Sequence, residues 1–154
     1  MKASALVALL CVILLSACGG GSKELSASDY RAKLATLGKE VTTAQAGIQQ
    51  ALKAKTVADL SARLKAFADA EGRIGTEVGK LHPPKDAKTA NEELAKGQRD
   101  IATAVGNLAT QVENAASVQA GLKLMEQDQA AGSAVQEVDH AIAALKKLGY
   151  SEGS

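Results

Sequence analysis

The spacing of apolar residues is the feature that most constrains how this chain can fold. In the segment after residue 25, apolar side chains recur at alternating steps of four and three residues, which is the a/d seam of packed α-helices. The seam consists of Tyr30, Leu34, Leu37, Val41, Ala44, Ile48 and Ala51. Three further segments carry helical stripes, and no β-branched run or hairpin dipeptide predicts a strand. The pattern therefore predicts an all-α fold.

The ends of the predicted helices are marked by capping residues and prolines. Ser26 and Thr56 are each followed three residues later by an aspartate, as at helix N-termini. Pro83 and Pro84 end the second helix, because proline disfavours helix in the preceding residue and donates no backbone hydrogen bond. A third helix is expected from near residue 85, and a fourth from about 117 to 148, ending at Gly149.

Four amphipathic helices of roughly 25 to 32 residues with short turns predict an antiparallel, up-down-up-down four-helix bundle. We expect residues 26–150 to form this bundle and residues 151–154 to be a disordered tail. Only 2% of the residues are aromatic, so alanine and aliphatic side chains must fill the core. With 18 basic and 17 acidic residues, the chain has no excess positive charge, and we expect no nucleic-acid partner.

The N-terminus has the pattern of a bacterial export signal. Met1 and Lys2 precede an apolar stretch, residues 3–15, that is too short to cross a bilayer as a helix. The sequence Leu15-Ser16-Ala17-Cys18 follows, with two small residues before a cysteine. This order resembles the lipobox of bacterial lipoproteins. An ordinary secretory signal with an incidental cysteine is the alternative interpretation.

The resemblance implies a covalent lipid anchor. In lipoproteins the thiol, here that of Cys18, receives a diacylglyceryl group, the signal is cleaved between Ala17 and Cys18, and the new amino terminus is often acylated, for example with palmitate. Residues 1–17 would then be the removed signal peptide, and residues 18–25 the lipidated cysteine and a flexible linker. The expected location is the extracytoplasmic face of a bacterial cell membrane, with membrane lipid as one partner.

Polar residues interrupt the predicted apolar stripes at one level of the bundle. Glu71 occupies a core position of the second helix, and Gln98 lies between two apolar positions of the third. Counting from the turns brings residues 38–41, and a segment that begins at Gln129, to a similar height. One hypothesis is a site for a small ligand or cation, because a buried carboxylate needs a partner. The alternatives are a hydrogen-bonded layer that sets helix register, or a Glu71 side chain that reaches solvent.

Three glycines, Gly72, Gly75 and Gly79, lie on one flank of the second helix. Each costs roughly 1 kcal/mol relative to alanine in a helix interior, so the group requires a reason. Close approach of a neighbouring helix is one explanation, and a groove for a partner helix or a lipid is another. A third explanation is a weak helix without a specific role.

No catalytic or metal-binding motif is present in the sequence. His82 and His140 are not spaced to share a helix face, and no nucleophile motif or metal-ligand pattern occurs. We therefore expect no enzyme activity, no metal and no cofactor other than the lipid on Cys18. The body resembles small alanine-rich helical lipoproteins of actinobacteria. The predicted function is a non-catalytic envelope lipoprotein that binds a protein or another envelope component, and the alternative is a lipoprotein that binds a small ligand or ion through the polar layer.

Overall fold

The computed structural model describes residues 23–150, and the predicted signal peptide, Cys18 and the C-terminal tail lie outside this range. The described part is all-α, with no strand between residues 23 and 150. Its elements are α1 (Ala27–Ala51), α2 (Val57–Lys80), the 3₁₀ helix η1 (Lys85–Ala87), α3 (Lys88–Glu113), α4 (Val118–Gln127) and α5 (Gln129–Lys147). Within this range, no helix has both the length and the apolar composition of a membrane span.

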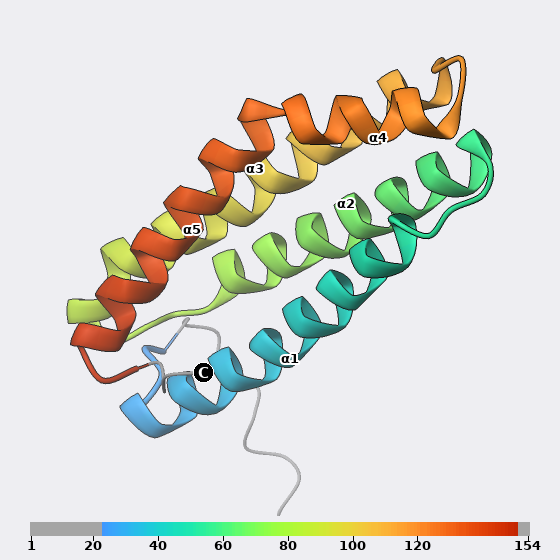
Figure 1. Cartoon of the computed structure of the whole chain (residues 1–154). Coiled ribbons are helices and arrows are strands. Elements are labelled where there is room, and N and C mark those ends of the chain that lie inside the picture. The colour runs from blue at the N-terminus through green and yellow to red at the C-terminus, as the bar shows by residue number, and fades with distance from the viewer. Residues whose placement is uncertain (1–22, 151–154) are drawn as a thin grey trace, which may run out of the picture.

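The helices lie side by side in an elongated bundle (Figure 1). α2 packs against both α1 and α3, and α3 also contacts α4 and α5. α2 and α3 form the centre of the structure and contribute most of its buried side chains, many of them alanines. The predicted helical class is therefore confirmed, and the core lies along the α2–α3 contact.

The predicted capping residues lie at the ends of the helices as expected. Ser26 and Thr56 each accept a hydrogen bond from the backbone N–H three residues later, at 3.1 Å in both cases. Gly149 adopts a positive φ of 79°, which glycine tolerates without steric cost. The N–H of Tyr150 then donates to the carbonyl oxygen of Leu145 at 2.9 Å, which closes the C-terminus of α5.

The fourth predicted helix is wrong in one respect, because the segment 117–148 is not continuous. Asp128 has an extended backbone (φ −75°, ψ 94°) and separates α4 from α5. Its side chain accepts hydrogen bonds from the N–H groups of Ala130 and Ala131, at 3.0 and 3.2 Å. Asp128 is thus an N-cap that starts a second helix, in place of an interior helical residue.

A cluster around two tyrosines closes one end of the bundle. Tyr30 is fully buried, and its hydroxyl donates to Oδ1 of Asn91 at 2.9 Å. Its ring meets that of Tyr150 in an edge-to-face arrangement with the centroids 5.3 Å apart. The Tyr150 hydroxyl donates to Asp86 at 3.0 Å, and Arg31 donates to the carbonyl oxygen of Gly149 at 2.7 Å. The start of α1, the start of α3 and the end of the chain are therefore joined here.

The apolar seam of α1 is fully buried only at its two ends. Tyr30 and Ala51 are buried, whereas the five seam residues between them remain partly exposed: Leu34, Leu37, Val41, Ala44 and Ile48. α1 contacts α2 and α5 contacts α3, but α1 and α5 have almost no contact with each other. The bundle is therefore open along the side between α1 and α5.

Candidate functional site

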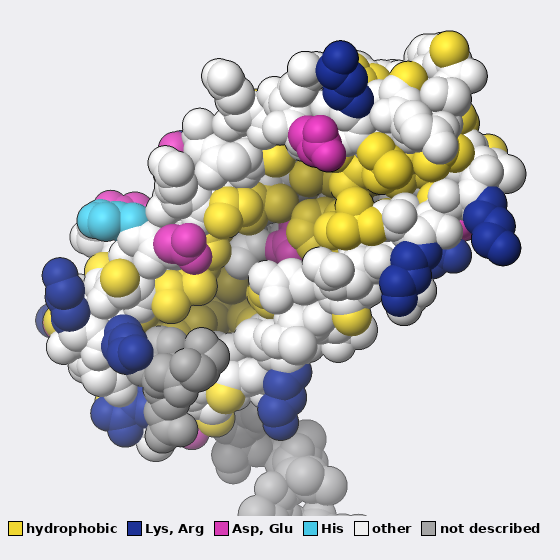
Figure 2. Space-filling view, in the orientation of Figure 1, with side chains coloured by type: hydrophobic (Ala, Val, Ile, Leu, Met, Phe, Trp, Pro, Cys, Tyr) yellow, Lys and Arg dark blue, Asp and Glu magenta, His cyan; other side chains and the backbone are white. Residues whose placement is uncertain are grey.

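The open side of the bundle forms an apolar groove, which we call the α1–α5 groove. It has a cavity volume of about 110 Å³ and is lined by Leu34, Leu37, Gly38, Val41, Ile74, Val78, Leu94, Gln98, Ile142 and Leu145. Figure 2 shows a hollow of hydrophobic side chains on this molecular face, with an acidic side chain visible within it. No lining residue is charged or aromatic, and Gln98 alone among them has a polar side chain.

The two polar residues predicted to interrupt the core are both buried. Glu71 is 2% exposed and Gln98 is 3% exposed. Within the described part of the chain, Oε2 of Glu71 and Oε1 of Gln98 have no hydrogen-bond partner. Such unpaired buried acceptors are rare in folded proteins, because each loses its bond to water without a replacement. They are the chemically distinctive atoms of this site.

Burial also changes the proton affinity of Glu71. Removal from water disfavours the charged form and raises the pKa of this carboxyl group to about 7. Near neutral pH, Glu71 therefore exchanges between a form that only accepts hydrogen bonds and a form that can donate one.

The contacts between α2 and α3 place Glu71 and Gln98 about one helical turn apart. A Cβ on Gly72, next to Glu71, would lie 3.5 Å from Cβ of Ala102. Gly75 instead faces Arg99, next to Gln98. Ile74, one turn along α2 from Glu71, lines the groove together with Gln98. The two acceptors thus occupy successive levels of the polar region, not a single layer.

The third predicted member of the polar layer, Gln129, does not join the other two. It is the first residue of α5 and is exposed. The cap at Asp128 moves the chain away from the path of a continuous helix, so Gln129 is not in the groove lining. The structure therefore brings Glu71 and Gln98 together in the interior and leaves Gln129 outside.

Two of the three predicted glycines allow α3 to approach α2. A Cβ built on Gly75 would lie 2.9 Å from Cγ of Arg99 and 3.0 Å from the carbonyl oxygen of Ala95. A Cβ on Gly79 would lie 3.1 Å from Nη1 of the same arginine. At Gly72 the corresponding contact is an ordinary 3.5 Å. At Gly75 this flank of α2 packs closely against α3 and Arg99, as the close-approach explanation expects, and at Gly79 it borders a second concavity.

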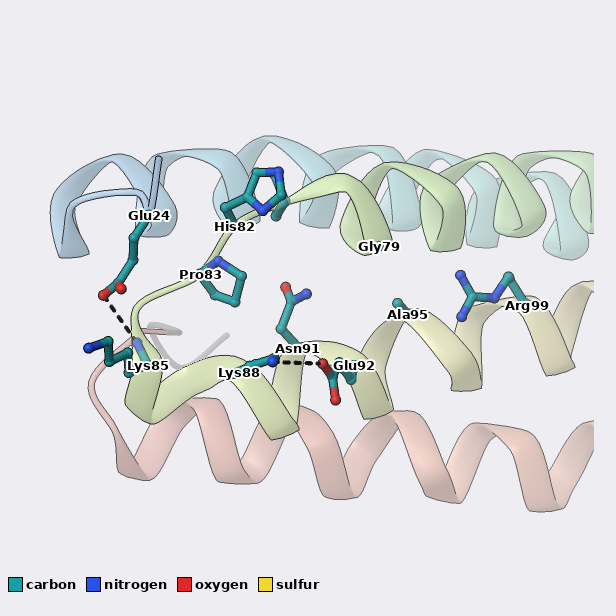
Figure 3. A pocket seen from close by; sticks show the side chains of 11 residues that line it. Glu24, Gly79, His82, Pro83, Lys85, Lys88, Asn91, Glu92, Ala95 and Arg99 are labelled. Atoms are coloured by element: carbon teal, nitrogen blue, oxygen red, sulfur yellow. Dashed lines mark hydrogen bonds and ion pairs between the residues drawn. The ribbon is translucent and has the colours of Figure 1, made fainter. Parts of the chain in front are cut away.

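A second concavity lies beside the Pro83–Pro84 turn (Figure 3). It has a volume of about 450 Å³, and Arg99 lies at the end away from the turn. Its charged side chains have both signs and include Glu24, Lys85 and Lys88. The backbone N–H of Lys85 donates to Glu24 at 3.2 Å, and Lys88 lies 4.0 Å from a glutamate one turn further along α3. The lining has three basic and two acidic side chains, and none of its residues has an unpaired buried side-chain atom.

The predicted histidines lie at separate places on the surface. His82 borders the concavity by the proline turn, and His140 lies 3.7 Å from Glu93 across the α3–α5 contact. Between residues 23 and 150, no group of three or more His, Cys, Asp or Glu side chains could hold a metal ion. The candidate site is therefore the α1–α5 groove.

The sequence pattern indicated Glu71 and Gln98 but not the groove beside them. Leu34, Leu37 and Val41 were predicted as seam residues of packed helices; they pack against the core and also line the groove. Two glycines on other helices were also missed: Gly97 packs against Val138, and Gly121 packs against Leu60. Comparisons with protein-family models, with curated proteins and with solved structures find no match to this chain. The function is therefore inferred from the geometry of the site.

Proposed function

We propose that this chain is a membrane-anchored, non-catalytic lipoprotein of the bacterial cell envelope. The support is the resemblance of residues 15–18 to a lipobox, which makes Cys18 the lipidated residue after cleavage at Ala17. We further propose an antiparallel up-down-up-down bundle in which α4 and α5 together take the fourth position. The paired contacts of Gly72 with Ala102 and of Gly75 with Ala95 support an antiparallel α2 and α3, since the numbers run in opposite directions.

In this proposal, the helical body binds a small apolar ligand in the α1–α5 groove. The observation that carries this proposal is the unpartnered acceptor of Gln98 in the lining of an apolar, accessible groove, with a second unpartnered acceptor on Glu71, one helical turn along α2 from the lining residue Ile74. A fully packed interior would favour a purely structural polar layer, but here the middle of the apolar seam of α1 is only partly buried and borders the groove. Ligand sites combine a mostly apolar lining with a few polar groups in this way.

A role in binding an envelope protein is the second candidate. It is favoured by two large apolar residues on α5 that remain exposed, Val135 at 45% and Ile142 at 40%. Ile142 also lines the groove, so a protein segment placed there would cover it. Crosslinking on intact cells, followed by identification of the captured protein, tests this role; a captured species that is lost on substitution of Ile142 by lysine would support it.

The membrane anchor is tested by Cys18→Ala in the producing bacterium. We expect this variant to be released from the membrane fraction and to incorporate no labelled fatty acid, because the acceptor thiol is absent. The unchanged protein is the positive control, and Cys11→Ala is the matched control because Cys11 lies within the predicted signal peptide. Continued labelling and membrane association of the Cys18 variant would overturn the lipoprotein assignment.

The groove is tested by filling it from α1. Gly38 lines the groove, and a Cβ there would have no atom of another helix within 4 Å, so Gly38→Leu can extend a side chain toward the groove. We expect this variant to lose binding of the fluorescent apolar probe N-phenyl-1-naphthylamine. Gly47→Leu is the matched control, since Gly47 is equally unobstructed, lies on the same helix and does not line the groove. Equal probe binding by both variants would exclude the groove as the site.

A further inference from the structure

The unpaired polar atoms in and next to the α1–α5 groove indicate the chemical class of its ligand. Building on the proposed binding function, we propose that the groove binds a primary alkylamine, with its aliphatic chain against the groove wall and its ammonium group reaching Gln98 and Glu71. When Glu71 is charged, both unpaired atoms, Oε1 of Gln98 and Oε2 of Glu71, are acceptors, and a ligand that pairs with them must supply donors. A primary ammonium group supplies three.

The charges around the groove favour a cationic ligand over an acidic one. No lysine or arginine lines the groove, so the carboxylate of a fatty acid would find no cation and would face Glu71. The nearby Arg73 points to Glu40 across the α1–α2 contact, at 3.5 Å. Arg99 lies over Gly75 and Gly79, on the flank of α2 that packs against α3. Within the described part of the chain, Oε2 of Glu71 is thus left without a cation or a hydrogen-bond donor.

The wall of the groove favours an aliphatic chain. Its apolar residues are leucine, isoleucine and valine, and no aromatic ring is present to stack on a planar ligand or to hold a cation by its π face. A volume of about 110 Å³ equals that of roughly four water molecules at about 30 Å³ each. The enclosed part of the ligand is therefore a short segment, and a longer chain would continue along the exposed seam of α1.

The test uses three probes that share one chain and differ in their polar group: hexylammonium, hexan-1-ol and hexanoate. Each is titrated against the full chain carrying Cys18→Ala, which stays without lipid, and binding is followed by displacement of N-phenyl-1-naphthylamine and by the NMR shifts of the Leu34 and Ile142 methyl groups. We expect hexylammonium to bind about tenfold or more tightly than hexan-1-ol, and hexanoate to bind least, because only the ammonium pairs with Glu71.

Substitutions identify the atoms responsible. Glu71→Gln preserves size and removes the charge, and we expect it to weaken hexylammonium about tenfold while leaving hexan-1-ol nearly unchanged. Glu113→Gln is the matched control, because Glu113 is exposed and pairs with Lys65 at 2.7 Å, away from the groove. Gln98→Leu removes the other acceptor and should also weaken hexylammonium. Circular dichroism of each variant establishes that it is folded.

The outcomes separate this inference from the function on which it rests. If hexan-1-ol or hexanoate binds as tightly as hexylammonium, or if Glu71→Gln and Glu113→Gln behave alike, the amine assignment is wrong and groove binding stands. If Gly38→Leu leaves displacement of the fluorescent probe unchanged, the proposed groove itself is wrong. If hexylammonium discriminates as expected and the effect is lost in Glu71→Gln, the ligand class is established.

Discussion

Replacement of Glu71 by glutamine tests whether ionisation of this buried carboxyl group destabilises the folded state. Burial raises its pKa from 4.5 to about 7, so the folded chain binds this proton more tightly than the unfolded chain does. Below pH 4.5 both states are protonated and the group has no effect. As the pH rises from 4.5 to 7, only the unfolded state ionises, and stability falls; above pH 7 both states are ionised and the loss levels off.

The magnitude follows from the size of this shift. A difference of about 2.5 pKa units at 1.36 kcal/mol per unit lowers the free energy of unfolding by about 3 kcal/mol between pH 4.5 and pH 8. Glutamine has nearly the same shape and does not titrate, so Glu71→Gln should avoid this loss. We therefore expect the variant to become more stable than the unchanged protein as the pH rises, with the difference growing by about 3 kcal/mol.

Urea denaturation at pH 4.5, 6 and 8, followed by far-ultraviolet circular dichroism, measures this difference. Other carboxyl groups titrate in both proteins and cancel in the comparison. Glu113→Gln, at an exposed position, should show no comparable growth with pH. A constant difference between Glu71→Gln and the unchanged protein would refute the argument, because it would mean that Glu71 is already solvated or paired in the folded state.

Three further substitutions test the packing and capping contacts. Gly75→Ala should lower the free energy of unfolding by roughly 1–2 kcal/mol, because its Cβ would press on the backbone of α3. Gly38→Ala should instead raise the free energy of unfolding by up to about 1 kcal/mol. Thermal or urea unfolding measures both, and equal effects at the two glycines would contradict the close approach of α3 to Gly75. Tyr30→Phe should lower the free energy of unfolding by about 1–3 kcal/mol, because it leaves Oδ1 of Asn91 buried without its donor. An unchanged unfolding midpoint would mean that this hydrogen bond does not stabilise the fold. Asp128→Ala should lower the free energy of unfolding by about 1 kcal/mol and reduce the helix content seen by circular dichroism, because the N-cap of α5 is lost. A rise in both the stability and the helix content would mean that this cap does not maintain the break between α4 and α5.

The sequence predicted the parts of the fold that depend on local pattern. Helical spacing identified the stripes, and Ser26, Thr56 and Gly149 marked helix ends because capping involves neighbouring residues. Glu71 and Gln98 could be found because each interrupts an apolar stripe, and the structure buries both. A polar residue at a core position is thus informative even when its role is unknown.

The remaining features depend on contacts between distant segments. Periodicity shows which face of α1 is apolar, but it does not show whether another helix covers that face, so the opening beside Leu34 and Val41 could not be predicted. A single aspartate within a helical pattern is equally compatible with an exposed interior position and with a cap. Asp128 therefore gave no decisive signal for the break, and the misplacement of Gln129 followed from it.

The contacts just before α1 determine where a mechanical load enters the molecule. The N–H of Leu25 donates to the carbonyl oxygen of His82 at 2.7 Å, and Glu24 accepts from the backbone of Lys85 at 3.2 Å. Tension applied to the chain ahead of Glu24 is thus transmitted to the turn between α2 and α3 before it reaches α1. In the proposed lipoprotein, the anchor at Cys18 would therefore pull on the tyrosine-rich end of the bundle, where α1, the α2–α3 turn and Tyr150 meet.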